Sequence, residues 1–477
     1  MYKDLVNYKT KCFLYRKKSA CIVVWTFVLI FLFFMKGCKV YAEEASTEKN
    51  TSVSTEASTE EKTEEKTEEK TEEKTEVTEP LDVQLSMTVR LYKGDKITLG
   101  IKDLRKADRV EVENINSRLA VINDKGELKA KRCGDARCRM VIYSGDTVKT
   151  LVLNVKVTKC SYRKRKSLSM YKDEKAKVMA SSVTQEATVS LASSNSKSVK
   201  LIKNSITAKK KGKSVITASA VKEGRRTELS VTVYVVEKPE LKVTNKMADN
   251  WFRGSIMAGH SVGVGFEQYC DSQYNGFLGN ARHISVGCYG VYNDMAPVSG
   301  SSLHPTINGR KARLKDHVYY LGAKKVFINY GLNDIGVYGP DRFVSSYKSL
   351  INELIRQNKK TTVYIVSPTP MYKDSGDLCN YNIRKINKQL KKYAKKTSRV
   401  EFIDVFTPML DGSGKLAGAY CSDAYCHITF EGYKVYSDTL KKYAKKKIVE
   451  ETDARDEAAT KKEIKKEQKR EKKKAGK

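Results

Sequence analysis

The alternation of apolar runs with amphipathic stretches after residue 241 limits what the C-terminal half of this chain can fold into. Short apolar runs typical of buried strands stand at residues 255–258, 283–286, 325–330, 362–366 and 400–404. Stretches with helical periodicity cover residues 342–357, 381–396 and 431–446. Strands that alternate with helices in this way indicate a three-layer α/β/α domain with a parallel sheet. We assign this domain to residues 241–450.

Polar and glycine-rich blocks follow the predicted strands. Gly259-His260-Ser261 follows the first run, Gly287-Cys288-Tyr289-Gly290 the second and Gly331-Leu332-Asn333-Asp334 the third, while Asp423 and His427 precede the last helix. The carboxyl ends of parallel strands meet at one edge of the sheet, where ligands bind. A serine at a strand-to-helix turn exposes its hydroxyl and places its N–H at a helix N-terminus, where negative charge is favoured.

These four blocks, in this order, resemble the SGNH (GDSL-like) hydrolase family over roughly residues 245–448. The resemblance implies a flavodoxin-like fold and hydrolysis of ester bonds by a serine, with no metal and no cofactor. It implies that Ser261 is the nucleophile, that His427 is the general base and that Asp423 orients His427. The backbone N–H groups of Ser261 and Gly287 and the amide of Asn333 would form the oxyanion hole.

Physical chemistry gives each of these roles a reason. A serine hydroxyl is a weak nucleophile until a neutral imidazole takes its proton. Donors aimed at the developing oxyanion stabilise the transition state, and the loss of one typically costs about 10²–10³ in rate. Gly290 remains an alternative to Gly287 as the donor from the second block.

Two departures from the family pattern bear on activity. The family usually has Gly-Asp-Ser, whereas this chain has Gly259-His260-Ser261. Neighbouring side chains on an extended segment diverge, so His260 is not expected to be the base. The family's acid and base stand three residues apart, whereas Asp423 and His427 are four apart. We expect the other histidines of this domain to be structural or surface residues: His283, His304 and His317.

An internal repeat of about 79 residues occupies residues 81–236. Residues 91–96 recur at 170–175, and each unit ends in an alternating apolar run, at 151–157 and 229–235. Short strands separated by polar turns predict a β-sandwich. Both units resemble bacterial immunoglobulin-like group 2 domains, which we place at residues 81–158 and 159–238. The resemblance implies spacers or surface adhesion modules without catalytic chemistry.

The N-terminus predicts export. Basic residues precede an apolar run at residues 20–35, and Val40-Tyr41-Ala42 supplies a small residue for cleavage. The run is shorter than the ~20 residues of a spanning helix, and this order of segments is typical of a signal peptide. We therefore predict a signal peptide at residues 1–42, with an uncleaved anchor as the alternative. The protein would be secreted or attached to the cell surface.

Charge is distributed unevenly along the chain. The formal net charge is +34, yet residues 43–80 hold 14 Glu and 5 Lys and include four copies of Thr-Glu-Glu-Lys. This segment has too few apolar residues to bury a core, so we predict a disordered spacer, with a single helix as the alternative. Residues 451–477 form a basic tail. For an exported protein, anionic wall polymers or acidic glycans suit this charge, and nucleic acid does not.

Eight cysteines lie beyond residue 42, an even number that permits disulfides in an exported chain. Sequence spacing favours a local pair between Cys133 and Cys138, and next between Cys421 and Cys426. Zinc is not expected, because no cysteine pair has a matched second pair at ligand spacing.

Three hypotheses about function follow. The first is an exported serine esterase or deacylase that removes acyl groups, above all acetyl, from envelope or extracellular polysaccharide, with an acyltransferase as its nearest variant. The second is a surface adhesion or scaffold protein with a degenerate hydrolase domain. The third is a wall-binding module governed by charge. The expected partners are acylated carbohydrate or another ester, and the membrane only through an uncleaved N-terminus.

Overall fold

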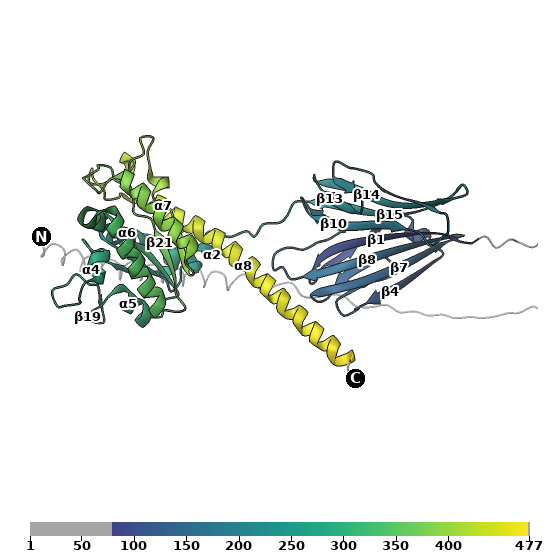
Figure 1. The fold of residues 1–477 in the computed structure, drawn as a ribbon, viewed down its shortest axis with the longest axis horizontal. Helices are drawn as coiled ribbons and strands as arrows, with labels where there is room; N and C mark the ends of the chain where they lie inside the picture. Colours follow the sequence, from purple (N-terminus) through teal and green to yellow (C-terminus); the bar gives the residue numbers. More distant parts are fainter. Residues whose placement is uncertain (1–78, 476–477) are drawn as a thin grey trace, which may run out of the picture. The chain divides into compact units, whose positions relative to one another are not determined.

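The computed structural model describes residues 79–475 of the chain. The predicted signal peptide and nearly all of the predicted spacer lie outside the described residues. Within residues 79–475, no helix has both the length and the apolar character needed to cross a bilayer. Two folded regions follow one another along the described chain, a β region and an α/β domain (Figure 1).

The β region, residues 81–236, consists almost entirely of strands. Its one short 3₁₀ helix is η1 (Leu104–Lys106). The strands of the first repeat are β1 (Leu81–Tyr92), β2 (Lys96–Thr98), β3 (Gly100–Ile101), β4 (Arg109–Ile115), β5 (Ala120–Ile122), β6 (Glu127–Ala130), β7 (Gly134–Ser144) and β8 (Thr147–Thr158). Those of the second are β9 (Ser169–Tyr171), β10 (Lys175–Ser181), β11 (Thr188–Ser193), β12 (Val199–Ile202), β13 (Ser205–Ala208), β14 (Gly212–Lys222) and β15 (Arg225–Val236).

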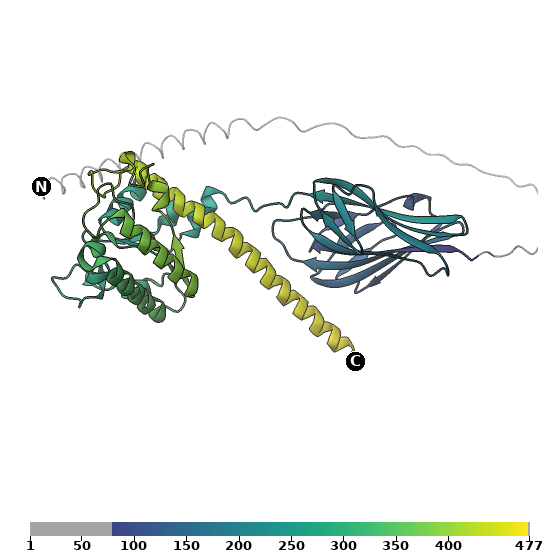
Figure 2. The same ribbon diagram turned by 45° about the horizontal axis from the view of Figure 1, so that its top comes forward.

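The two repeats share their sheets. The largest sheet has the order β12-β13-β10-β1-β8-β7-β4, and a second has the order β11-β14-β15-β3, with β9 also paired to β15. A small third sheet has the order β2-β6-β5. Strand β1 pairs parallel to β8 of its own repeat and antiparallel to β10 of the next. Figure 2 shows the strands in stacked layers.

This pairing corrects the expected separation of the repeats at residues 158 and 159. Buried side chains of both repeats, from Leu81 to Val235, form one continuous core. The physical reason lies in β1, which pairs with β8 on one edge and with β10 on the other, so that one sheet runs through both repeats. The described β region is therefore a single unit, while its immunoglobulin-like character stays a prediction.

The same strands exclude the disulfide that spacing favoured. Cys133 immediately precedes β7, and Cys138 lies within it, paired with Leu153 of β8. Five residues of extended chain span about 16 Å. Two Cα atoms more than about 7 Å apart cannot be bridged without movement of the backbone. The Cys133–Cys138 prediction is therefore wrong.

The second region is the α/β domain. Its helices are α2 (Asn245–Trp251), α3 (Ser261–Asp271), α4 (Val291–Met295), α5 (Leu314–Leu321), α6 (Leu332–Gln357), α7 (Asn380–Lys396) and α8 (Phe430–Ala475). Its strands are β16 (Ile256–Gly259), β17 (Arg282–Ser285), β18 (Thr306–Ile307), β19 (Arg310–Lys311), β20 (Lys325–Asn329), β21 (Thr362–Val366) and β22 (Val400–Ile403). Short 3₁₀ helices are η2 (Phe277–Asn280), η3 (Thr407–Met409) and η4 (Gly418–Tyr420).

Five strands form one parallel sheet of order β17-β16-β20-β21-β22, which confirms the predicted α/β class. The order places β16 at the point where the connections reverse direction, which is where such sheets bind ligands. Helices α5, α6 and α7 pack side by side over the sheet (Figure 1), whereas α2 and α3 each contact α8. Helices on both faces explain why β20 and β21 are nearly continuous apolar runs.

Candidate active site

Ser261 begins helix α3 directly after strand β16, so the strand-to-helix turn presents its side chain at the carboxyl end of the sheet. The turn is tight, because a Cβ added to Gly263 would lie 2.5 Å from the Ser285 hydroxyl oxygen. Gly259 faces a similar limit, since its added Cβ would lie 2.9 Å from the Gly263 Cα. Glycine at 259 and 263 therefore lets β16, β17 and α3 approach closely behind Ser261.

The predicted acid and base come together with the serine. His427 Nε2 lies 2.9 Å from Ser261 Oγ, and His427 Nδ1 lies 2.5 Å from Asp423 Oδ2. The two ring nitrogens thus face a hydroxyl on one side and a carboxylate on the other. A proton on Nδ1, donated to Asp423, leaves Nε2 free to accept the serine proton.

A loop with one extra residue makes this geometry possible. Asp423 Oδ1 accepts the backbone N–H groups of Tyr425, Cys426 and His427 at 2.9–3.1 Å. Ala424 adopts a left-handed conformation, with φ of 56°. The left-handed turn accommodates the additional residue, so the spacing of four still brings the His427 ring onto the Asp423 carboxylate.

The hydrogen bonds that the Asp423 carboxylate accepts favour its ionised form. Partial burial raises the pKa of this carboxyl, but hydrogen bonds from the His427 ring and from the three backbone N–H groups outweigh burial. The pKa of Asp423 therefore lies well below its usual range. A carboxylate that stays ionised at neutral pH can hold the His427 ring and stabilise it when it becomes protonated.

The loop after β17 decides between the two glycines considered as oxyanion donors. The N–H of Gly290 donates to Asn293 Oδ1 at 2.9 Å. A Cβ added to Gly290 would also lie 2.6 Å from the Asp334 carboxylate. Gly287 is exposed, and a Cβ there would meet nothing within 4 Å. The Gly290 N–H is thus already bound and its surroundings are filled, whereas the surroundings of Gly287 are open.

Asn333 stands near the same loop at the start of α6. Its Nδ2 donates to the backbone oxygen of Tyr289 at 2.9 Å. A side-chain amide has two N–H bonds, so the second remains available to a ligand. Asn333 therefore links the loop after β17 to the loop after β20. Both loops lie at the carboxyl ends of strands in the same parallel sheet.

His260 does not join the serine. Its side chain is buried, and its Nδ1 accepts the N–H of Val262 at 3.3 Å as the N-cap of α3. Burial, and then the nearby His427, lower the pKa of His260 to about 4, so the ring is neutral at pH 7. His260 thus caps the helix that carries Ser261.

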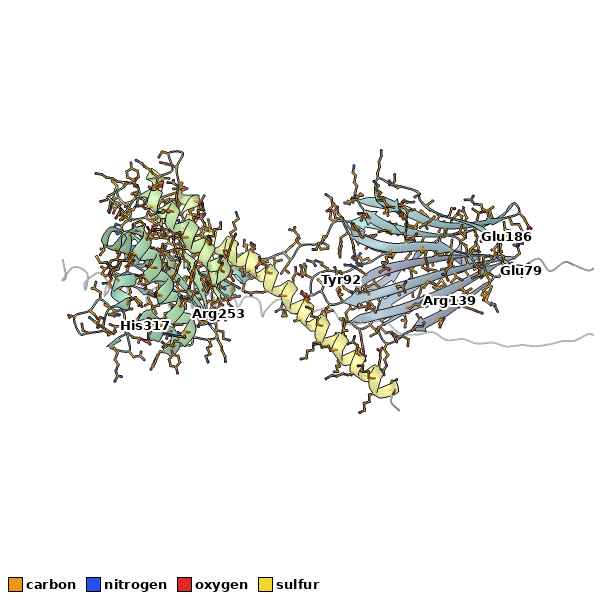
Figure 3. The ribbon with its side chains drawn as sticks, in the orientation of Figure 1. Glu79, Tyr92, Arg139, Glu186, Arg253 and His317 are labelled. Atoms are coloured by element: carbon orange, nitrogen blue, oxygen red, sulfur yellow. The ribbon has the colours of Figure 1, made fainter. Side chains whose placement is uncertain are left out.

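The other predicted structural histidines are buried or partly buried. His317 on α5, marked in Figure 3, makes a hydrogen bond of 3.0 Å to the Pro305 carbonyl oxygen. His304 contacts the Ser302 hydroxyl at 2.9 Å. His283 packs against Phe266, and burial lowers its pKa to about 4.

The supporting roles of two residues were not predicted from the sequence. Tyr433 on α8 donates its hydroxyl to the Val262 carbonyl oxygen at 2.9 Å, which ties the helix after His427 to the helix of Ser261. Asn293 closes the loop of Gly290, as described above. No local pattern could mark the contact of Tyr433, because its partner Val262 stands 171 positions away in the sequence.

One group of side chains in the described residues has metal-ligand character. Ligand atoms of Asp423, Cys426 and His427 lie within 4.8 Å of one another. Asp423 and His427 already bind each other, and a structural zinc site usually requires four protein ligands. The residues present therefore suit acid–base chemistry better than a structural zinc ion.

Comparison with known proteins places this site in a family. Residues 254–435 match the GDSL-like Lipase/Acylhydrolase family. No curated protein matches the chain. Solved structures similar to it include a GDSL-like lipase from Bacteroides thetaiotaomicron, at 20% identity over 42% of this chain and 90% of that chain, with a TM-score of 0.31. Another is a carbohydrate esterase family 3 protein from Talaromyces cellulolyticus, at 13% identity over 42% and 98% of the two chains, with a TM-score of 0.30.

The family match covers the turn of Ser261, the loop of Gly287, the start of α6 at Asn333 and the loop of Asp423 and His427. It does not extend to the β region. Residues 254–435 therefore form a GDSL-like lipase/acylhydrolase domain, and the chain is a hydrolase of ester bonds.

Proposed function

We propose that the protein is an exported serine esterase that removes acyl groups, above all acetyl, from an envelope or extracellular polysaccharide. The observation that carries the chemistry is the 2.9 Å contact between Ser261 Oγ and His427 Nε2, with Nδ1 of the same ring on Asp423. The His427 side chain is 45% exposed, which leaves room for a bulky polymer to approach.

The reaction runs in two halves. His427 takes the Ser261 proton as Oγ attacks the ester carbonyl carbon, and the N–H groups of Ser261 and Gly287 with the Asn333 amide stabilise the oxyanion. The protonated ring then gives its proton to the departing sugar oxygen, which leaves an acyl group on Ser261. Water, activated by His427, releases the acyl group as a carboxylic acid. A second sugar hydroxyl in place of that water would make the protein an acyltransferase.

A series of chromogenic esters with acyl chains of two, four and eight carbons tests the esterase. We expect turnover in the presence of EDTA, fastest with acetate, and a loss of about 10⁴-fold or more in kcat/KM in Ser261→Ala. Ser272→Ala, at the far end of the same helix, is the matched control. An unmodified protein that turns over no ester above background, or a Ser261→Ala variant as active as it, would refute the proposal. Acetate release from an O-acetylated polysaccharide then tests the substrate.

Export is a separate part of the proposal. The basic and apolar segments before Ala42 support it. Sequencing the N-terminus of the protein recovered from the cell surface or medium should give a chain that begins at Glu43. A protein that stays in the cytoplasm would contradict export without bearing on the esterase chemistry.

A second candidate function is binding of an anionic wall polymer, favoured by the last part of α8. Seven exposed lysines fall within an arc of about 140° on this helix, at 3.6 residues per turn. We call this set the basic face: Lys461, Lys462, Lys465, Lys466, Lys469, Lys472 and Lys473. The acidic residues of the segment, Glu463, Glu467 and Glu471, lie outside the arc. If the hydrolase domain were inactive and the protein acted as a scaffold, the basic face alone would bind the polymer.

Co-sedimentation with a glycerol-phosphate polymer tests the second candidate. Binding should weaken with salt, because exposed charges are screened. It should be lost in a fourfold Lys→Glu variant at Lys462, Lys465, Lys469 and Lys472. The control is a fourfold Lys→Glu variant of equal charge on exposed positions of α7, at Lys385, Lys388, Lys391 and Lys392. Equal loss in both variants would mean that net charge alone attracts the polymer.

A further inference from the structure

Two cysteines flank the acid and the base. Cys421 pairs with Ile428 in a short antiparallel bridge, and the Ser422 N–H donates to the His427 carbonyl oxygen at 2.9 Å. Cys426 stands in the turn of this small hairpin, two residues before Ile428, and both thiols are free in this structure.

Both thiols converge on one carboxylate. Cys421 Sγ lies 3.6 Å from Asp423 Oδ1. Cys426 Sγ lies within 4.8 Å of an Asp423 carboxylate oxygen. Cys426 is buried, with 8% of its surface exposed, whereas Cys421 is half-buried. The two sulfur atoms thus approach the same carboxylate from the two ends of the loop.

Tyr425, between the two cysteines, packs against the domain core, and its carbonyl oxygen accepts the N–H of Tyr372 at 2.8 Å. Ala424, at its tip, is exposed and holds a left-handed conformation, which disfavours a residue with a Cβ. Hydrogen bonds to the Asp423 side chain hold the turn, and that side chain is 32% exposed. A cross-link at the base of the loop would restrict the turn to the conformation that joins Asp423 to His427.

We propose that Cys421 and Cys426 form a disulfide that closes the loop carrying Asp423 and His427. The oxidation of the two thiols rests on the proposed export, and the effect of the cross-link on turnover rests on the proposed esterase activity. In an exported protein the surroundings are oxidising, where such bonds persist. Cys133 and Cys138 cannot form the equivalent bond, because β7 holds them apart.

The oxidation requires a disulfide as the electron acceptor, either a small-molecule disulfide or that of a thiol–disulfide oxidoreductase. The Cys421 thiolate attacks one sulfur of the acceptor, which forms a mixed disulfide and releases one thiol. The Cys426 thiolate then attacks the Cys421 sulfur and releases the second thiol. Two protein thiols become one disulfide, and the acceptor gains two electrons and two protons. Cys421 is half-buried and Cys426 is buried, so the acceptor reaches Cys421 first; burial, with Asp423 and Cys421 nearby, raises the pKa of Cys426 to about 12.

Peptide mass measures the bond directly. Trypsin cuts after Lys415 and Lys434, and the peptide 416–434 contains Cys421, Cys426 and no other cysteine. Protein oxidised with glutathione disulfide and then alkylated without reduction should give this peptide unalkylated and two hydrogen atoms lighter than its dithiol form. A peptide alkylated at both cysteines, or joined to another cysteine peptide, would overturn the proposal.

Reducing the protein and then removing the reductant by desalting measures how the disulfide affects the loop. We expect kcat to fall by roughly threefold to tenfold, because small displacements of catalytic groups are costly, and the melting temperature to drop. The Cys421→Ser/Cys426→Ser double variant should match the reduced protein and not respond to reductant, whereas Cys379→Ser should respond like the unmodified protein. If reduction changes neither kcat nor melting, the bond does not hold the loop. If the protein turns over no ester, the peptide mass and the melting temperature still show whether the disulfide forms.

Discussion

At the Asp423–His427 pair, one additional residue lengthens the loop without separating the two side chains. Ala424 takes the left-handed conformation, and Asp423 Oδ1 gathers three backbone N–H groups. The resemblance to the SGNH family implied that these two residues are partners. The sequence could not show that a spacing of four works, because the answer depends on the backbone angle of a single alanine.

Asp423→Asn tests the role of the carboxylate. We expect kcat to fall by about 10²–10⁴-fold, because the amide no longer stabilises a protonated His427 or selects its tautomer. Ester hydrolysis by purified protein measures this, with KM expected to change little. Asp438→Asn, an exposed carboxylate paired with Lys434 on α8, serves as the control. A variant that keeps full kcat would mean that the loop backbone alone orients His427.

Among the elements, the contact between α3 and α8 aligns the serine with the base. Tyr433 is buried, and its hydroxyl binds the Val262 carbonyl, one residue after Ser261. A Cβ on Gly265 would lie 2.2 Å from that hydroxyl oxygen. Glycine at 265 therefore allows the close packing of these two helices.

Gly265→Ala should consequently destabilise the domain by about 1–3 kcal/mol, since overpacking displaces Tyr433. The matched control is Gly336→Ala in α6, where an added Cβ meets nothing within 4 Å. There the better helix propensity of alanine should stabilise by up to about 1 kcal/mol. Urea unfolding of both variants measures the difference, and equal stabilities would contradict this account of the packing.

Helix α6 also carries a buried carboxyl group whose pKa differs from its usual value. Burial raises the pKa of Asp334 to about 7, although the N–H groups of Tyr292 and Val291 oppose the shift. Between about pH 4 and 7 the folded protein keeps this proton while the unfolded chain has lost it. The free energy of unfolding therefore falls as pH rises through this window, by about 2–4 kcal/mol.

Asp334→Asn removes this contribution. In a chain that begins at residue 79, Trp251 is the sole tryptophan and reports unfolding of the α/β domain. Its fluorescence in urea at pH 5 and pH 8 should show that the variant gains stability relative to the unmodified protein as pH rises. If both proteins respond equally to pH, Asp334 does not titrate in this range.

On the scale of the whole described molecule, the repeat of the β region does not divide into two independent units. Leu85 of β1 aligns with Leu151 of β8 on one side and with Ala180 of β10 on the other. Strand β3 of the first repeat pairs with β15 of the second. Internal similarity in a sequence thus identifies related segments. It does not show whether their strands pair with one another, because such pairing depends on long-range contacts.

Residues 79–158 and residues 159–238, prepared separately, should therefore each lack a cooperative thermal transition. The joint fragment 79–238 should melt in one step, because both repeats contribute to a single core. Circular dichroism during heating measures this, and amide chemical-shift dispersion reports whether each fragment is folded. A sharp transition in residues 79–158 alone would show that the first repeat needs no partner.

By itself, the sequence determined the elements of this protein and the residue types at the ends of its strands. The period of apolar residues is local, so the parallel α/β class could be predicted from it, while the resemblance to the SGNH family implied the candidates Ser261, Asn333 and His427. Tertiary structure alone decided which groups meet. It brought Ser261 to His427 across 166 positions of sequence, and it committed the Gly290 N–H to Asn293. It also merged the two repeats, because strand pairing depends on contacts that no local pattern encodes.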